Sequence, residues 1–193
     1  MGCGKTPHSS CAVGFIGDQT QMPEVQMLVT DGKSMMLSPV ADGDSIPMEP
    51  PPQGGYVLYI GAAARNLDGC NVNLAGTLRD PATGDELGFD ARDTNLVVGA
   101  DGWGRSDARD NSNESNVNAC PDYFPVDRVN GTFNLEMKAT DREGRTASVT
   151  HPVKLVCDPS LSPSQFANCV CTCEANYVLG RCNGFVLDGG VSD

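Results

Sequence analysis

The sequence is poor in the residues that several common functions require. Only 13 of its 193 residues are Lys or Arg, against 25 Asp and Glu, and the formal net charge is −12. Nucleic-acid binding depends on clustered basic side chains, and none cluster here, so we expect no nucleic-acid partner. An anionic membrane surface is disfavoured for the same reason. No apolar run reaches the roughly 18 residues of a transmembrane helix.

Signatures of catalysis are equally scarce. The chain has two histidines, His8 and His151, and lacks both the Gly-x-Ser-x-Gly elbow and the His-Glu-x-x-His helix. The segment 2–6 ends like a phosphate-binding loop but has neither the earlier glycine nor a strand before it. Carboxylates from different strands can still meet in space, so paired-carboxylate chemistry stays open. We predict that the protein is not an enzyme.

Cysteine, in contrast, is abundant: nine residues, five of them after residue 156. This density indicates either disulfides in an oxidising compartment or a metal site. The alternating Cys169, Cys171 and Cys173 could supply thiolates to zinc. The simpler interpretation is disulfides, in which each of the three pairs with a distant partner, because residues two apart seldom bridge each other. The candidates are Cys11, Cys70, Cys120, Cys157, Cys169, Cys171, Cys173 and Cys182, and we expect Cys70 to pair with Cys120.

Short segments of alternating polar and apolar residues predict an all-β fold. Alternation occurs at 25–29, 71–78, 133–140 and 147–155, beside an apolar run at 56–64 and a short candidate at 95–98. About seven such strands favour an antiparallel β-sandwich. We predict an N-terminal tether at 1–21, a sandwich at 22–156, and a cysteine-rich C-terminal module at 157–193. Residues 162–166 are expected to begin one short helix in that module.

The polar, glycine-rich segment 99–118 is predicted to be a long loop, and loops of that length are often functional. Its oxygen-bearing side chains could bind calcium through Asp101, Asp107, Asp110 and Asn113, although Asp and Asn are also ordinary turn residues. Asp90 and Asp93 are expected to flank another turn. Trp103 is either an aromatic anchor for a partner, together with Asp107 and Asp110, or a core residue. We expect no cofactor other than possible calcium.

The string Asn134-Leu135-Glu136-Met137-Lys138-Ala139-Thr140-Asp141-Arg142-Glu143-Gly144-Arg145-Thr146-Ala147 resembles the last hairpin of bacterial immunoglobulin-like domains of the PKD and invasin type. Gly-Gly-Tyr-Val-Leu-Tyr at 54–59 resembles an early core strand of myxobacterial-type surface lipoproteins. The resemblance implies an immunoglobulin-like sandwich over residues 23–156. It departs from antibody-type domains at Trp103, which lies in the polar segment and not between two framework cysteines.

The opening Met1-Gly2-Cys3-Gly4 resembles the end of a bacterial lipoprotein signal, in which a small residue precedes the lipidated cysteine. This resemblance implies a lipid anchor at Cys3, the only membrane contact that we expect, and an extracytoplasmic location at the bacterial outer membrane or cell surface. It leaves eight cysteines, an even number, for disulfides.

Together these features predict a non-enzymatic, structural or adhesive surface protein that binds a protein or glycan through the loops of its sandwich. One alternative is a self-associating subunit of a surface filament or layer. Another is an accessory carbohydrate-binding module or a secreted hydrolase.

Overall fold

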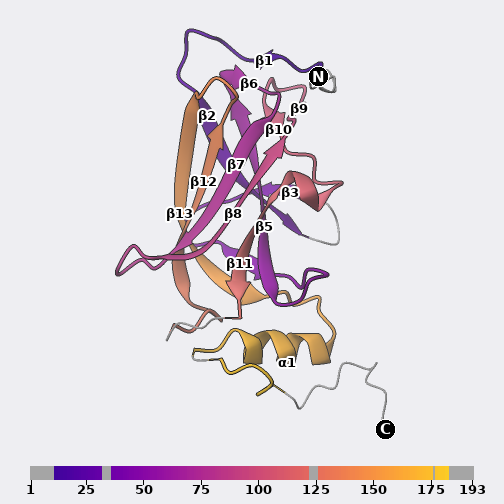
Figure 1. Ribbon diagram of the computed structural model, residues 1–193, viewed down its shortest axis with the longest axis vertical. Helices are drawn as coiled ribbons and strands as arrows, with labels where there is room; N and C mark the ends of the chain where they lie inside the picture. Colours follow the sequence, from indigo (N-terminus) through magenta and orange to yellow (C-terminus); the bar gives the residue numbers. More distant parts are fainter. Residues whose placement is uncertain (1–10, 32–35, 122–125, 176, 183–193) are drawn as a thin grey trace, which may run out of the picture.

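The computed structural model describes residues 11–31, 36–121, 126–175 and 177–182. Two β-sheets face each other across one hydrophobic core, with a two-stranded sheet at one end and the helix α1 at the other (Figure 1). The strands are β1 (Phe15–Ile16), β2 (Glu24–Asp31), β3 (Met36–Pro39), β4 (Ser45–Met48), β5 (Tyr56–Arg65), β6 (Leu67–Asp68), β7 (Val72–Arg79), β8 (Glu86–Thr94), β9 (Val97–Val98), β10 (Gly104–Arg105), β11 (Ser115–Cys120), β12 (Thr132–Thr140) and β13 (Thr146–Cys157); α1 is Pro163–Thr172.

The strand order is that of an immunoglobulin-like sandwich. The first sheet runs β3-β2-β5-β10-β9, and β11 also pairs with β5; the second runs β4-β13-β12-β7-β8. β2, β5 and β11 thus occupy the positions of strands A, B and E, while β7, β12 and β13 occupy those of C, F and G. β4 joins β13 in parallel. The predicted all-β sandwich with a disulfide-rich C-terminal module is confirmed.

The hairpin of β12 and β13 was the clearest prediction and forms as expected. Its register pairs Ala139 with Ala147 and continues without a break to Thr132 and Lys154. Phe133, Leu135, Met137 and Ala139 are all buried on one face of β12. Alternation with period two makes this possible, because successive side chains of a strand point to opposite faces of the sheet. Full burial of one such large apolar side chain stabilises the fold by about 1.5–3 kcal/mol.

Several strands were not predicted, and the two longest of them are β8 and β11. Asp90 and Asp93 lie within β8, not beside a turn, and residues 115–118 belong to β11, not to a loop. β8 is an edge strand exposed or half-exposed along most of its length, so its sequence carries no alternation to detect. At Gly88 a Cβ atom would lie only 2.1 Å from the carbonyl oxygen of Asn118. The edge strands of the two sheets therefore meet there at a distance that only glycine allows.

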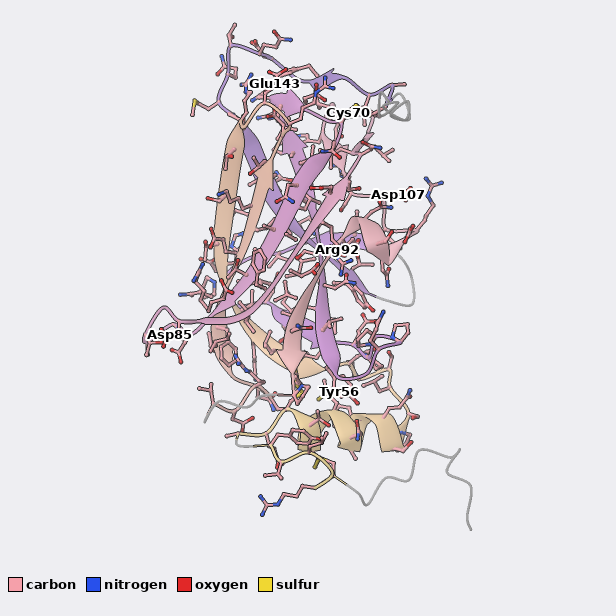
Figure 2. The ribbon with its side chains drawn as sticks, in the orientation of Figure 1. Tyr56, Cys70, Asp85, Arg92, Asp107 and Glu143 are labelled. Atoms are coloured by element: carbon pink, nitrogen blue, oxygen red, sulfur yellow. A yellow bond between two sulfur atoms is a disulfide. The ribbon has the colours of Figure 1, made fainter. Side chains whose placement is uncertain are left out.

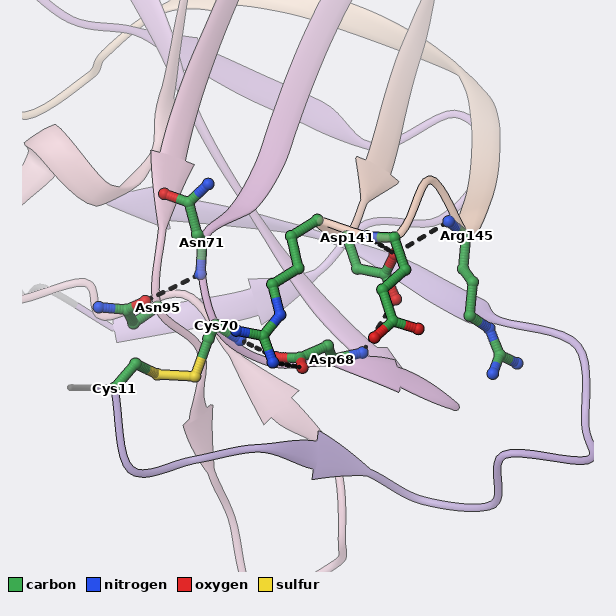
Figure 3. A network of polar contacts seen from close by, with 9 residues as sticks. Cys11, Asp68, Cys70, Asn71, Asn95, Asp141 and Arg145 are labelled. Atoms are coloured by element: carbon green, nitrogen blue, oxygen red, sulfur yellow. Dashed lines mark hydrogen bonds and ion pairs between the residues drawn. A yellow bond between two sulfur atoms is a disulfide. The ribbon is translucent and has the colours of Figure 1, made fainter. Parts of the chain in front are cut away.

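The segment predicted as a tether is packed over one end of the sandwich in its described part, residues 11–21. β1 pairs with β6, and Cys11 forms a disulfide with Cys70 (Figure 3). Arg145, from the turn between β12 and β13, donates hydrogen bonds to the carbonyl oxygens of Gln19 at 3.2 Å and Gln21 at 2.6 Å. Its guanidinium also lies 5.1 Å from the centre of the Phe15 ring.

A buried carboxylate holds that end together. Asp141 accepts hydrogen bonds from the backbone N–H groups of Asp68 at 3.0 Å, and of Glu143 and Arg145 at 2.9 Å each (Figure 3). Asp68 in turn accepts from the Cys70 N–H at 2.8 Å and pairs with Arg142 at 2.6 Å. The turn of the last hairpin is thereby fixed to β6 by contacts between residues more than seventy positions apart.

The C-terminal module docks at the opposite end. α1 begins with a capping box formed by Ser162 and Gln165, as the sequence predicted for a helix start. The Tyr56 hydroxyl donates to the carbonyl oxygen of Gln165 and to Asn168 Oδ1, each at 3.0 Å, and Figure 2 shows Tyr56 beside the helix. The disulfides there are Cys120–Cys173, Cys157–Cys169 and Cys171–Cys182.

The predicted pairing of Cys70 with Cys120 is wrong. Cys70 follows β6 at the end of the sandwich that carries the N-terminal segment, whereas Cys120 ends β11 beside α1 (Figure 1). The two sulfurs are therefore at opposite ends of the domain, and each pairs with a cysteine outside the sandwich strands, Cys11 and Cys173. The interpretation that alternating cysteines take distant partners is confirmed for Cys169, Cys171 and Cys173.

Candidate functional site

A cleft of about 590 Å³ lies on the side of the sandwich where β5, β8 and β11 come together. Its floor comes from β5, whose even-numbered residues enter the core and whose odd-numbered residues face outward. The turn before β5 and the 3₁₀ turn Asn111–Asn113 form its ends. The lining residues are Pro51, Pro52, Gln53, Gly54, Val57, Tyr59, Asp90, Arg92, Asn111, Ser112, Asn116 and Asn118. This volume is typical of sites for small ligands.

An ion pair occupies the β8 wall. Asp90 Oδ2 accepts from Arg92 Nε at 2.7 Å and from the backbone N–H of Asn116 at 2.9 Å. The Arg92 side chain is 40% exposed, and Figure 2 shows it midway along the sandwich. Among the described residues, its two terminal nitrogens donate to no protein acceptor, so both can donate to a ligand.

Tyr59 forms the floor and is largely buried. Burial raises the pKa of its phenol, against a hydrogen bond with the Asn111 side chain that lowers it. The phenol is therefore neutral at physiological pH. The 3₁₀ turn is capped by Asp110, whose carboxylate accepts from the backbone N–H of Ser112 at 2.9 Å.

Amide groups dominate the remaining surface. Asn116 and Asn118 lie on either side of Val117 in β11, so both point away from the core that Val117 enters. The Asn118 amide offers one acceptor and two N–H donors in a plane. The amide nitrogen of Asn116 instead donates to the carbonyl oxygens of Glu114 at 3.1 Å and Asn111 at 3.2 Å, so chiefly its oxygen is left for a ligand. With Gln53 and Asn111, the cleft presents planar amides from three separate segments of the chain.

The residues predicted to form a partner-binding loop do not line this cleft. Trp103 is half-exposed, in neither the core nor the cleft, and the guanidinium of Arg65 lies 4.6 Å from its ring centre. Asp107 pairs with Arg109 at 2.6 Å, and that hydrogen bond lowers the pKa of its carboxyl. Asp110 serves as the cap described above. The predicted segment 99–118 contributes other residues to the cleft: Asn111, Ser112, Asn116 and Asn118.

The residues predicted for calcium are engaged in other contacts. Asp101 pairs with Arg105 at 2.5 Å, which lowers the pKa of its carboxyl, and Asn113 Oδ1 accepts from the Thr94 hydroxyl at 3.1 Å. In the part of the chain that the structure describes, no three His, Cys, Asp or Glu side chains are placed to hold a metal ion. Calcium binding stays a prediction. Cys3, the predicted lipid anchor, and His8 lie outside the described residues.

Sequence reasoning missed Tyr59 and Arg92, and it singled out neither Asn116 nor Asn118, although both lie in the predicted segment 99–118. One signal was present: asparagine recurs at 111, 113, 116 and 118, and the last two flank a valine with the period of a strand. Arg92 carried no comparable signal, because β8 has no clear alternation.

No protein-family model, curated protein or solved structure matches this chain. Within the described ranges, no helix has the length and apolar character needed to cross a membrane.

Proposed function

We propose that the chain is an exported, cell-surface binding protein whose ligand is a neutral glycan held in the cleft between β5, β8 and β11. The observation that carries the proposal is the lining of that cleft, in which amides and one ion pair outnumber apolar side chains. Sugar hydroxyl groups both donate and accept hydrogen bonds, and planar amides and a guanidinium supply both roles at fixed positions.

A glycan fits this surface better than a protein partner does. Protein interfaces are depleted of charge at their centres and are anchored by apolar or aromatic residues. In this cleft the aromatic residue Tyr59 is only 6% exposed and Val57 5%, whereas the polar groups above them face solvent. The glycan-binding form of the predicted adhesive role is therefore the one we propose.

Binding without catalysis is part of the proposal. Glycoside hydrolysis usually needs two carboxyl groups facing the scissile bond. The described residues that line this cleft include a single carboxylate, Asp90, and it is already bound to Arg92 and to the Asn116 N–H.

Disulfides support the location that we propose. Four disulfides join eight cysteines in the described residues, and such bonds persist in oxidising compartments outside the cytosol. A lipid anchor at Cys3 would place the packed N-terminal segment nearest to the membrane, and it is tested by the mass of the N-terminal peptide from exported protein.

Arg92→Ala and Asn118→Ala are each expected to raise the Kd for a neutral oligosaccharide by about tenfold, because each removes one or two ligand hydrogen bonds worth about 1 kcal/mol apiece. The measurement is isothermal titration calorimetry with cellohexaose, maltohexaose and chitohexaose, beside a heparin hexasaccharide as the anionic comparison. Thermal unfolding of each variant checks that the loss of the Arg92–Asp90 pair leaves the fold intact.

Asn134→Ala is the matched control, since it removes a half-buried asparagine from β12 of the second sheet, outside the cleft. It should bind the sugars like the wild type. If none of the neutral hexasaccharides bound with a Kd below about 1 mM, or if the cleft variants bound as tightly as the wild type, the proposal would be rejected.

A further inference from the structure

Glu114 is a buried carboxyl group with too few partners. It follows the 3₁₀ turn directly, and its side chain is completely inaccessible to solvent. Oε1 accepts a short hydrogen bond from the hydroxyl of Thr30 on β2, whereas Oε2 has no hydrogen-bond partner among the residues that the structure describes. An ionised carboxylate in such a place is strongly disfavoured, because it loses water and gains one neutral donor in return.

The surroundings of Glu114 supply negative charge. On the β5 side, Gly61 lies beside the carboxyl group. A Cβ atom at residue 61 would lie 2.2 Å from Ser106 Oγ and 3.5 Å from Glu114 Oε1. β5 also contributes the neutral phenol of Tyr59, and β2 contributes the Thr30 hydroxyl. Among the described residues, two charged groups act on the carboxyl: Glu49, which follows β4, and Asp107, which lies between β10 and the 3₁₀ turn. Both are acidic.

The basic residues nearest in sequence are already engaged. Arg105 pairs with Asp101, and Arg109 pairs with Asp107. Burial raises the pKa of Glu114, and the charges of Glu49 and Asp107 raise it further, against the Thr30 hydrogen bond that lowers it. The neutral form of the carboxyl is thus the form that this environment accommodates.

Glu114 also lies between the two parts of the chain that line one wall of the cleft. Asn111 and Ser112 precede it, while Asn116 and Asn118 follow it on β11. Its backbone N–H donates to the carbonyl oxygen of Asn111 at 3.3 Å, which closes the 3₁₀ turn. Movement of this one residue would therefore displace the wall.

We propose that Glu114 is a proton-controlled latch, which holds residues 106–114 on the outer face of the first sheet when it is neutral and releases them when it is ionised. The effect on the cleft rests on the proposed glycan site, but the movement of the segment does not. The latched state would be fully favoured below the ordinary pKa of a glutamate. Its advantage would be lost as the pH rises through the higher pKa of the folded state. Ligand affinity would then weaken from acidic to mildly alkaline pH.

Hydrogen exchange measured by mass spectrometry from pH 4 to pH 8 tests the latch in the wild-type protein. The exchange of residues 106–114 is divided by that of β12 in the same molecule, which cancels the pH dependence of the chemistry. We expect the relative opening to increase by up to tenfold per pH unit, the slope for one proton, and then to level off. A relative opening that did not change with pH would overturn the proposal.

Three variants sharpen this test. Glu114→Gln removes the titrating group and should abolish the slope. Glu143→Gln replaces an exposed carboxylate at the far end of the sandwich (Figure 2) and should leave the slope unchanged. Thr30→Val removes the one hydrogen bond that favours ionisation, so the curve should level off at a higher pH. An unchanged slope in Glu114→Gln would overturn the latch. If that variant did not fold, the Thr30→Val shift and the wild-type curve would decide.

The binding measurement separates the latch from the proposed function. The Kd of the best neutral hexasaccharide is measured across the same pH range. If no sugar bound at any pH, the proposed function would fail while the exchange experiment still tested the latch. If a sugar bound equally well as the segment opened, control of the site by Glu114 would be rejected.

Discussion

Replacing both Cys120 and Cys173 by alanine is expected to lower the free energy of unfolding by about 4 kcal/mol. The disulfide spans 53 residues, and the chain-entropy relation for a closed loop of that length gives about this value. It is also the covalent link between β11 of the sandwich and the end of α1. Urea unfolding under non-reducing conditions, followed by circular dichroism, measures the change.

The paired variant of Cys171 and Cys182 is the matched control. That disulfide spans only 11 residues and lies wholly within the C-terminal module. It joins no strand, so its loss should loosen the module and leave the unfolding of the sandwich within about 1 kcal/mol of the wild type. Equal destabilisation of the sandwich by both variants would show that the Cys120–Cys173 link has no special part in the stability of the domain.

Asp141→Ala is expected to destabilise the protein by about 3 kcal/mol. The side chain is 4% exposed and accepts three backbone hydrogen bonds, one of them from the buried N–H of Asp68. Hydrogen bonds to a charged acceptor contribute about 1.5–3 kcal/mol each, and a buried donor left without its acceptor adds a desolvation cost. In the variant, water can hydrogen-bond to the N–H groups of Glu143 and Arg145 in the turn. It reaches the buried N–H of Asp68 less easily. Thermal and urea unfolding of the variant measure the loss.

Asp80→Ala separates the long-range contact from the turn itself. Asp80 accepts from the N–H groups of Ala82 and Thr83 in an exposed turn, much as Asp141 does in its own turn. Within the described part of the chain, its side chain bonds to no distant strand. The expected loss is below about 1 kcal/mol. Similar losses for the two variants would mean that Asp141 stabilises only its turn and not the junction with β6.

Much of the sandwich could be predicted because its central strands are amphipathic. β12 buries Phe133, Leu135 and Met137 and exposes the residues between them, and this single-faced pattern is visible in the sequence. β8 was not visible, because an edge strand exposed on most of its surface needs no alternation. Gly88 of β8 lets β11 approach closely. This is a contact between residues far apart in the chain, so the sequence pattern does not reveal it.

The candidate site was harder to predict than the fold. Sequence reasoning placed the functional surface around Trp103 and Asp107, because that segment is long and polar. The structure uses most of those polar groups locally: Asp107 binds Arg109, and Asp110 caps the 3₁₀ turn. The cleft combines Arg92 and residues of β5 with four other residues of the predicted segment 99–118, namely Asn111, Ser112, Asn116 and Asn118. These side chains come from separate segments of the chain, so no spacing in the sequence predicts that they lie together.

The sequence by itself determined the all-β class, the last hairpin and the start of α1, and it favoured disulfides over a metal site, because each depends on periodicity, on local turn and capping chemistry, or on composition. Only the tertiary structure decided which cysteines pair, where the cleft lies, and that Glu114 is buried beside Thr30. The physical reason is the same in the three cases. Disulfide pairing, a cleft and the burial of a charge depend on distances between residues far apart in the chain, and those distances exist only after the two sheets have packed.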